Sequence, residues 1–353
     1  MPPTRIAVAG AGAIGLAHIA VLQGSAVCAL SAIVDPAPGA VAIAAKAGVR
    51  LYASIGDLLA KDRPDGLVLA TPNALHLPQG LQCIEARLPI LLEKPIATTV
   101  AEGEQLVRAV DATGAKVLIG HHRAHSPIMA KAKEVVGSGK LGKLVAVMGS
   151  ATFFKPDSYY ADAPWRREVG AGPILANMIH EVHSLRMLCG DIVAVQAFAS
   201  NAIRGFEVED TVAINLRFAS GVLGSFMLSD TAACARSWEQ TAQEDKAYPS
   251  YGDEDCYVIT GTNGSLSLPT LRLKTYPRVE DRSWWKEFEV GVVGLVRSDP
   301  LKHQMAHFVK VVRGEALPLV SARDGLQNLR VAEAIALAAK SGQIVQIQPK
   351  ESP

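Results

Sequence analysis

Three glycines at a fixed spacing constrain this chain more than any other feature of its sequence. Gly10, Gly12 and Gly15 follow the apolar run Arg5–Ala9 and open the Ala/Leu-rich stretch Ile14–Gln23. Glycines in this arrangement turn the chain tightly after a strand, let a phosphate approach backbone N–H groups, and let the following helix pack on the sheet. The spacing therefore predicts a strand, a phosphate-binding turn and a helix, in that order.

An acidic residue follows at the distance that a bound dinucleotide requires. Asp35 comes directly after the run Cys28–Val34, about 20 positions after the glycines, where a carboxylate can bind a ribose 2′-hydroxyl. Pro36 comes next, and no Arg or Lys stands in the following few residues to bind a 2′-phosphate. The combination favours NAD over NADP. In the alternative interpretation, the glycines form an ordinary turn and Asp35 is a surface cap.

Hydrophobic runs over the first third of the chain alternate with helical stretches, which is typical of a parallel sheet covered on both faces. We expect strands at Arg5–Ala9, Cys28–Val34, Gly66–Ala70, Pro89–Leu92 and Lys116–Ile119. We expect helices at Ile14–Gln23, Ala40–Ala47, His76–Glu85 and Val100–Thr113. The predicted class is α/β, with a doubly wound Rossmann sheet in a domain over residues 1–123.

Residues 124–353 have a different pattern, with several strands and little helix between them, which predicts an antiparallel-rich α+β domain. The expected strands are Leu144–Thr152, Ile192–Ser200, Thr211–Phe218, Gly221–Ser229, Tyr257–Thr260 and Ser265–Leu268. Asp230–Tyr251 and Pro277–Leu301 are polar stretches with aromatic residues, which we expect to be loops over a pocket. Asp324–Ser341 is expected to be a helix that packs near the domain junction.

Composition indicates a globular, cytoplasmic protein. The 353 residues are 49% hydrophobic and 20% charged, with a formal net charge of +1, which argues against nucleic-acid or membrane partners. The sequence shows neither a signal-peptide pattern nor an apolar run of the ~18 residues that a spanning helix needs. Five cysteines without ligand spacing are expected to be reduced thiols, and no metal site is predicted.

Polar residues follow two further strands at the ends where parallel sheets bind ligands. Thr71, Pro72, Asn73 and His76 follow the third strand, and Glu93 with Lys94 follows the fourth. A lysine that leaves a buried strand is a functional candidate, because desolvation can lower its pKa into a useful range. Alternatively, Lys94 reaches the surface and pairs with Glu93.

In this order, these motifs resemble the glucose–fructose oxidoreductase/inositol dehydrogenase (Gfo/Idh/MocA) family. The likeness continues through Gly120–Arg123, Trp165-Arg166, Gly172–His180 and Asp324–Arg330. It implies an open, mostly antiparallel second sheet that makes a homodimer or homotetramer, a cis peptide before Pro95, and Lys94 beside the substrate. The predicted cofactor-binding residues are Gly10, Gly12, Ala13, Ile14, Gly15, Asp35, Thr71, Pro72, Asn73, His76, Glu93 and Lys94.

His180 matches the catalytic histidine of the family, and its setting agrees. At helical spacing, Asn177, His180 and Ser184 share one polar face that is free to line a cleft. A histidine is suited to take a hydroxyl proton near neutral pH. The sequence departs from the family in one respect: Ala176 stands where many relatives place an aspartate. An Asp–His pair is therefore not assumed, although Asn177 can still bind a substrate hydroxyl. His183 and His180 are three residues apart, which does not match the HExxH spacing of a zinc site.

Aromatic side chains and hydrogen-bond donors mix between Lys155 and Arg167, which suits a polyhydroxylated ring. The predicted substrate-binding residues are Arg123, Tyr160, Trp165, Arg166, Asn177 and His180. Arg123, Arg166 and Arg236 can bind a carboxylate if they converge, and Trp238 with Glu239 can close the same pocket. An ordinary loop with a packing tryptophan is the alternative.

The predicted activity is NAD-dependent oxidation of a secondary alcohol of a sugar, cyclitol or related cyclic polyol. His180 is expected to act as acid/base and Lys94 to polarise the reacting oxygen. Three alternatives stay open: a dehydrogenase of a carboxylated ring (a sugar acid or cis-dihydrodiol), a redox-neutral glycosidase that uses NAD transiently, and a non-catalytic NAD-binding sensor.

Overall fold

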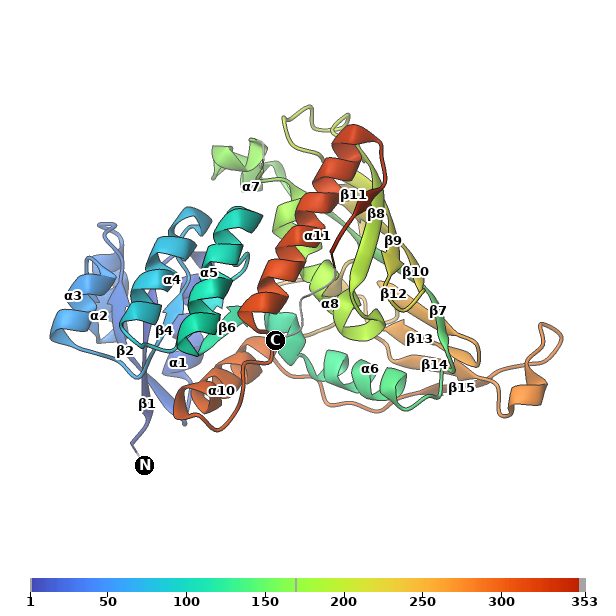
Figure 1. Ribbon diagram of the computed structural model, residues 1–353, viewed down its shortest axis with the longest axis horizontal. Coiled ribbons are helices and arrows are strands. Elements are labelled where there is room, and N and C mark those ends of the chain that lie inside the picture. Colours follow the sequence, from blue (N-terminus) through green and yellow to red (C-terminus); the bar gives the residue numbers. More distant parts are fainter. Residues whose placement is uncertain (1, 169, 349–353) are drawn as a thin grey trace. The chain divides into compact units, whose positions relative to one another are not determined.

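The computed structural model describes residues 2–168 and 170–348, and the chain divides into two compact units (Figure 1). The first unit contains Met1–His125 and Pro300–Leu329, and the second contains Ser126–Asp299 and Arg330–Pro353. The sequence pattern predicts one second domain for all residues after 123. This boundary needs correction at the C-terminal end, because a late segment of the chain returns to complete the first unit.

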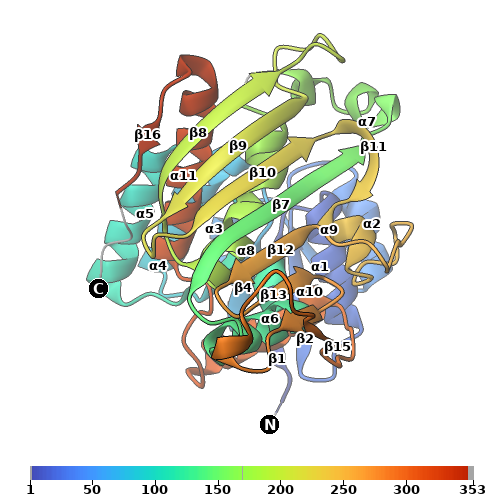
Figure 2. The same cartoon turned by 90° about the vertical axis from the view of Figure 1, so that its right-hand side faces the viewer.

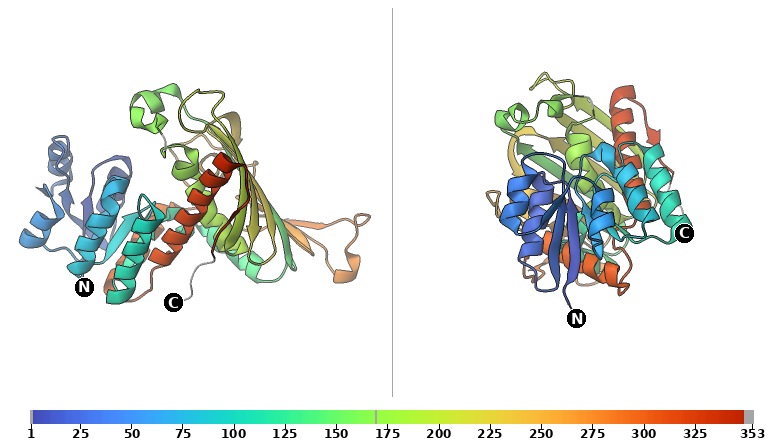
Figure 3. Two further views of the ribbon diagram at one scale, coloured as in Figure 1. Left: turned by 45° about the horizontal axis from the view of Figure 1, so that its top comes forward. Right: turned by 90° about the vertical axis from the view of Figure 1, so that its left-hand side faces the viewer.

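A parallel six-stranded sheet in the order β3-β2-β1-β4-β5-β6 forms the centre of the first unit. Figure 3 shows helices on both sides of it, as the pattern predicted. The strand order reverses between β1 and β4, which is where doubly wound sheets bind their ligands. The strands are β1 (Thr4–Ala9), β2 (Cys28–Val34), β3 (Arg50–Tyr52), β4 (Gly66–Leu69), β5 (Ile90–Glu93) and β6 (Val117–Gly120). The helices are α1 (Ala13–Gln23), α2 (Ala40–Ala47), α3 (Ile55–Lys61), α4 (His76–Glu85), α5 (Val100–Thr113) and α10 (Pro300–Arg313), with short η1 (Asn73–Leu75) and η2 (His122–His125).

Helix α10 explains why the first unit extends beyond the predicted boundary. The helix packs against α1, η2 and β6, and buries Phe308 and Val309. A Cβ atom on Gly66, at the start of β4, would lie 3.1 Å from the Phe308 ring, so helix and strand are in close contact. The apolar side of α10 thus covers part of this sheet. Helix α11 (Ala322–Ser341) follows and contributes residues to both units.

The second unit is built on a ten-stranded sheet in the order β15-β14-β13-β12-β7-β10-β9-β8-β16, with β11 paired to β7. All pairs are antiparallel except β7 with β10. The strands are β7 (Leu144–Phe154), β8 (Ile192–Ser200), β9 (Thr211–Phe218), β10 (Leu223–Ser229), β11 (Thr231–Arg236), β12 (Tyr257–Gly261), β13 (Gly264–Leu268), β14 (Arg272–Thr275), β15 (Glu289–Val292) and β16 (Val345–Gln346). The helices are α6 (Pro127–Gly137), α7 (Asp157–Ala161), α8 (Ile179–Cys189) and α9 (Trp238–Thr241), with short η3 (Pro164–Arg167), η4 (Ile174–Met178) and η5 (Val279–Asp281).

One face of this second sheet is covered and the other is open. Side chains from α6, α8 and the inner face of the sheet form a common core, which includes Met129, Val182, Phe226 and Tyr257. Figure 2 shows the opposite face of β7, β8, β9 and β10 with no helix over it among the described residues. The open, mostly antiparallel sheet implied by the family resemblance is confirmed.

The two stretches expected to be loops over a pocket have structure of their own. The first contains β11 and α9, and Trp238 is only 3% exposed because it packs near Tyr257 in the core. The second contains η5 and β15, and Figure 1 shows it as a hairpin that projects beyond the sheet. Trp284 and Trp285 near its tip are 88% and 85% exposed. Neither stretch is a simple pocket loop, so this expectation was wrong.

Candidate active site

Glycine suits each of the three positions after β1 for a different physical reason. Gly10 has a φ of +89°, and a Cβ atom there would lie 2.4 Å from the carbonyl oxygen of Ala70. A Cβ atom on Gly15 would lie 1.9 Å from the carbonyl oxygen of Gly10. A Cβ atom on Gly12, by contrast, would meet no described atom within 4 Å. Protein packing therefore requires glycine at positions 10 and 15, whereas position 12 leaves space for a ligand to approach.

Asp35 lies at the edge of the same loop. Its Oδ2 accepts a hydrogen bond from the Ala11 N–H at 2.7 Å, and its Oδ1 accepts one from the Ala37 N–H at 2.8 Å. Gly12 is the N-cap of α1, where it has no side chain to offer to the first N–H groups of the helix. A helix N-terminus and a carboxylate thus stand together, which is the donor and acceptor pair that a dinucleotide needs. The exposed side chain of Ile14 adds apolar surface beside them.

His76 links the turns that follow β4 and β5. Its Nδ1 lies 2.7 Å from the Pro95 carbonyl oxygen and its Nε2 lies 3.0 Å from the Thr71 carbonyl oxygen. Burial lowers the pKa of His76, although the two carbonyls oppose this effect. The ring is 1% exposed, so both nitrogens are engaged inside the unit. The prediction that His76 binds the cofactor directly therefore needs correction, because its ring holds the two turns together.

Glu93 also lies beneath the predicted site and not on its surface. It is 5% exposed, and its Oε1 is 2.8 Å from Nε2 of His18 on α1. Its Oε2 accepts the Lys94 N–H at 3.3 Å. Burial opposes the charged form most strongly, but the hydrogen bond and charge of His18 hold the pKa of Glu93 below its usual value. Glu93 therefore supports the following residue, and its burial argues against the predicted direct contact with a cofactor. The Lys94–Pro95 peptide is cis, as the resemblance implied.

Thr71, Pro72 and Asn73 form the turn between β4 and η1. The Thr71 hydroxyl donates to Oε1 of Gln79 at 2.6 Å, and the Asn73 side chain is exposed. Lys94 is half-buried at the end of β5, the strand next to β4. The two turns that carry these predicted functional residues therefore follow adjacent strands of one sheet, β4 and β5.

In the second unit, a π-helical turn, η4, leads directly into α8. Glu209 fixes its start by accepting the Ile174 N–H at 2.9 Å, and burial raises the pKa of Glu209. A π turn adds one residue to a helical turn, so the 3.6-residue spacing fails across Asn177. Helix α8 is also buried on several sides: His180 is 9% exposed and Ser184 is 0% exposed. The predicted polar face free to line a cleft is therefore wrong for Ser184.

Asn177 is held by a residue that the sequence analysis did not single out for a role of its own. Nζ of Lys155, just after β7, donates to Oδ1 of Asn177 at 2.8 Å and lies 3.5 Å from Oδ2 of Asp230. Asp230 is buried and also binds Nε of Arg204 at 3.2 Å. Burial lowers the pKa of Lys155, and Asp230 opposes that effect. The result is a chain of polar contacts from the end of β10 to the turn before His180.

The predicted substrate-binding residues near α7 divide into buried and accessible groups. Tyr160 is 3% exposed, and its hydroxyl donates a hydrogen bond to Asp230 at 2.5 Å. The prediction that Tyr160 contacts the substrate directly therefore needs correction, because its hydroxyl supports the Asp230 carboxylate. Arg166 stacks over the Tyr159 ring at 3.8 Å and its neighbour Trp165 is 59% exposed. Arg236 forms an ion pair with Glu254 at 3.0 Å.

Arg123 belongs to η2 of the first unit, where it is 2% exposed. This burial argues against the prediction that Arg123 binds the substrate from an open surface. The predicted convergence of three arginines on a carboxylate therefore stays a prediction for Arg166 and Arg236 and is not supported for Arg123.

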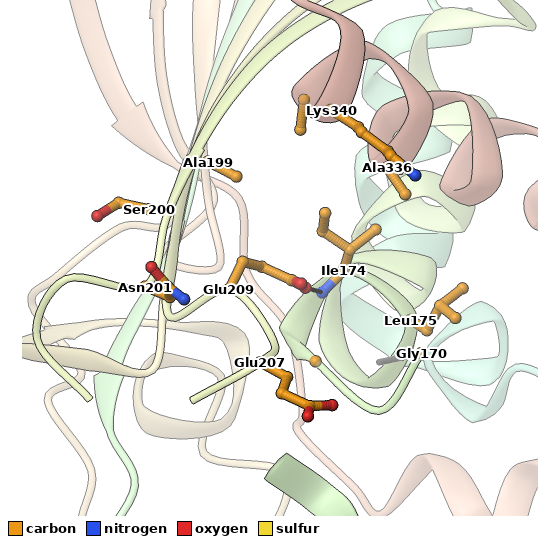
Figure 4. A pocket seen from close by; sticks show the side chains of 12 residues that line it. Gly170, Ile174, Leu175, Ala199, Ser200, Asn201, Glu207, Glu209, Ala336 and Lys340 are labelled. Carbon is orange, nitrogen blue, oxygen red and sulfur yellow. Dashed lines mark hydrogen bonds between the residues drawn. The ribbon is translucent and has the colours of Figure 1, made fainter. Parts of the chain in front are cut away.

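A pocket of about 410 Å³ lies in the second unit. Figure 4 shows it between the end of β8, the turn before α8 and the last turns of α11, with Glu209 reaching Ile174. Its lining is mostly apolar and also includes Lys340, Glu207 and Glu209. It gathers none of the predicted substrate-binding residues.

The described residues 2–168 and 170–348 also bear on other functional classes. No set of three or more His, Cys, Asp or Glu side chains there is arranged to hold a metal ion. None of the helices in this part of the chain has the length and apolar character to cross a membrane. Cys28, Cys83, Cys189 and Cys256 are buried free thiols, and burial raises the pKa of Cys83 and of Cys189 to about 12. Such thiols are core residues and poor nucleophiles.

The fold and the glycine loop define an NAD-binding oxidoreductase, and comparison with known families agrees. Residues 4–121 match the oxidoreductase family with an NAD-binding Rossmann fold, and residues 129–267 match the GFO/IDH/MocA C-terminal domain. The chain belongs to the Gfo/Idh/MocA family of oxidoreductases.

Several characterised proteins are similar over most of their length. The 1,5-anhydro-D-fructose reductase of Ensifer adhaerens is 26% identical over 298 residues, which cover 84% of this chain and 83% of the reductase. The inositol 2-dehydrogenase of Rubrobacter xylanophilus is 25% identical over 330 residues, which cover 88% and 83%. The crystal structure of the WlbA dehydrogenase from Bordetella pertussis, in complex with NADH and UDP-GlcNAcA, is 26% identical with a TM-score of 0.77 and covers 98% of this chain and 99% of that one.

Proposed function

We propose that this chain is an NAD-dependent dehydrogenase that oxidises a secondary alcohol of a sugar, cyclitol or related cyclic polyol. The observation that carries the proposal is the glycine loop: Gly12 leaves open space beside Asp35, at the switch point of a sheet in which Lys94 directly follows strand β5. Relatives named inositol 2-dehydrogenase and 1,5-anhydro-D-fructose reductase support the substrate class.

In the proposed reaction, the residues of the chain manage the proton and the orientation of the substrate. His180 takes the proton of the hydroxyl, and the Lys94 ammonium group donates a hydrogen bond to the same oxygen. Asn177 donates its amide N–H to a neighbouring substrate oxygen. The loop at Gly12 and Asp35 would hold NAD, which when bound would supply the hydride acceptor for the carbon that carries the hydroxyl.

A second candidate substrate is a carboxylated ring. Lys155 and Arg166 lie on the Tyr159 ring, with the Lys155 Nζ 5.0 Å and the Arg166 Cζ 3.8 Å from its centroid. Two cations at one aromatic residue favour an anionic group on the substrate. UDP-GlcNAcA, which the WlbA dehydrogenase binds, is a sugar acid and supports the same candidate.

The test is NADH formation, measured by absorbance, over a panel of sugars, cyclitols, sugar acids and cyclic cis-diols. We expect turnover with NAD, slower turnover with NADP, and a loss of at least about 100-fold in kcat for Lys94→Ala and for His180→Ala. Lys46→Ala, an exposed lysine on α2, is the matched control. Tight NADH binding without turnover on any compound would contradict the proposal and favour the redox-neutral glycosidase or the sensor.

We also propose that the protein works as a homodimer or homotetramer in the cytoplasm, through the open face of the second sheet. Exposed apolar side chains on that face support this proposal: Met148, Phe198, Leu223 and Met227 are each 44% to 68% exposed. A sheet face of this kind is a common place for a second copy to bind.

A further inference from the structure

A buried histidine on the helix of the glycine loop has no role in the reaction as proposed. His18 lies in the middle of α1 and is 0% exposed. Its Nε2 is 2.8 Å from Oε1 of Glu93, and its Nδ1 contacts no partner among the described residues. A buried polar side chain is costly unless it is paired, so the single contact with Glu93 is the main reason for a histidine here.

The Glu93 carboxylate is held in a narrow space between three elements. His18 reaches its Oε1 from α1, and its Oε2 accepts the Lys94 N–H at 3.3 Å. On the side of β6, a Cβ atom on Gly120 would lie 2.8 Å from that Oε2 and 2.8 Å from Glu93 Cα. Strand β6 therefore leaves room for the Glu93 carboxylate only because residue 120 has no side chain. Each oxygen has a fixed direction.

The charges that face this carboxylate come from every element around it. They are His18 on α1, His122 on η2, His76 on α4, and Lys94, which follows Glu93 in the chain. Burial opposes the charged form of Glu93, but the hydrogen bond and charge of His18 are the largest effects that lower its pKa. His18 therefore contributes more than any other side chain to stabilising the buried Glu93 carboxylate next to Lys94.

We propose that His18 is a positioning residue for Lys94: it holds one oxygen of Glu93 on the α1 side, fixes the other on the Lys94 N–H, and limits the pull of the carboxylate on the Lys94 ammonium group. The inference rests on the proposed function for the catalytic role of Lys94. It also gives the helix that begins at the cofactor loop a direct contact with the support of that lysine.

Removal of His18 has a definite expected effect. In His18→Leu, Glu93 loses the hydrogen bond on Oε1, so this oxygen becomes a stronger acceptor and can turn toward the ammonium group of Lys94, the next residue in the chain. The Lys94 amine is then held more firmly as an ammonium ion, so less of the reactive neutral amine is present at a given pH. In a Glu93→Gln background no carboxylate remains to attract Lys94, so the same His18 change should leave the reactivity of Lys94 unaltered.

The experiment measures the reactivity of Lys94 without any substrate. The wild type, His18→Leu, Glu93→Gln and the double variant are labelled with trace acetic anhydride at pH 7 to 10, and acetylation of each lysine is read by mass spectrometry. We expect labelling of Lys94 at pH 8 to fall about tenfold in His18→Leu, which corresponds to one pKa unit. The fall should be absent when His18→Leu is made in Glu93→Gln. Lys46 and Lys302, both exposed in the same unit, are the internal standards.

Two results would overturn the proposal: unchanged Lys94 labelling in His18→Leu, or an equal fall in the Glu93→Gln background. NADH binding, followed by fluorescence, verifies that each variant is folded, and His18→Met, which likewise has no side-chain donor, replaces His18→Leu if that variant unfolds. Because the labelling needs no turnover, it separates the two claims. A tenfold change in labelling in a protein that oxidises no compound of the panel keeps the positioning role and rejects the dehydrogenase.

Discussion

The Asn177 side chain has a defined direction because its two ends are not equivalent. Lys155 can only donate, so the atom it contacts at 2.8 Å is the amide oxygen of Asn177. The Nδ2 group is then the end that remains for a ligand, and it can only donate. A substrate oxygen that meets Asn177 must therefore accept a hydrogen bond, as a hydroxyl, carbonyl or carboxylate oxygen can.

We expect Lys155→Met to weaken substrate binding more than it slows the chemical step. Asp230 keeps Arg204 and Tyr160 as partners, so the fold should persist. The amide of Asn177 loses its fixed orientation, which should raise KM about tenfold and change kcat by less than about threefold. Steady-state kinetics with the best compound of the panel measure both. Lys140→Met, at an exposed position, is the control. A fall in kcat at constant KM would contradict the orienting role.

His76 should make the stability of the protein depend on pH. Burial lowers its pKa in the folded state, whereas the unfolded chain protonates near the ordinary value of about 6.5. As the pH falls below that value, the unfolded state takes up a proton that the folded ring resists, so the free energy of unfolding decreases. We expect His76→Asn to lose less stability than the wild type between pH 7.5 and 5.5, by up to about 1.4 kcal/mol for each pH unit. Urea unfolding at the two pH values measures the difference, and equal losses would contradict the prediction.

The residues that the sequence analysis located are those whose role depends on local backbone. Gly10 and Gly15 belong to the turn after β1, and Asp35 directly follows the next strand, β2, so spacing alone predicts them. His18 and Glu93 are 75 positions apart, and their contact depends on how a helix packs on a sheet. A polar residue on the buried side of an expected helix was the one available signal for His18. The burial of Tyr160 and His76 likewise comes from tertiary packing, which a motif does not contain.

At the level of elements, the turn from β1 to α1 allows a sharp separation of folding from binding. Gly15→Ala places a Cβ atom 1.9 Å from a backbone oxygen, whereas Gly12→Ala meets no described atom within 4 Å. We expect Gly12→Ala to keep the melting temperature within about 2 °C and to weaken NADH binding at least tenfold, because the ligand loses its close approach. Gly15→Ala should lower both. Thermal melts and NADH fluorescence measure these effects, and tight binding by Gly12→Ala would contradict the assignment of the loop.

Regular elements were predictable and irregular ones were not. The bounds of α2, α4, α5, β8 and β9 agree with the hydrophobic pattern, because each presents a full face to a core. Strand β3 has three residues and is too short for a period to show. The π turn of η4 is set by tertiary anchors, including Glu209 on Ile174, so a regular helix was expected across it. Ser184 was assigned to the wrong surroundings for another reason: α8 is buried on several sides.

For the whole molecule, the open sheet face should hold copies of the chain together. Met148 lies opposite Ser225, Met227 opposite Ala213, and Ala213 opposite Phe198, so the apolar side chains share one face. We expect light scattering to give a dimer or tetramer for the wild type and a monomer for Phe198→Glu/Met227→Glu. Val41→Glu, at an exposed apolar position on α2, is the control. An unchanged mass for the double variant would place the interface elsewhere.

The division of the chain between its units also governs how the protein is made. A ribosome releases the strands of the parallel sheet first, but α10, which packs against α1 and β6, emerges only after Asp299. Until then the apolar surface that Phe308 covers in the folded protein is exposed to solvent, while residues 126–299 of the second unit are still being synthesised. The nucleotide-binding unit therefore completes its folding near the end of translation, and a nascent chain that stops before residue 300 needs protection from aggregation.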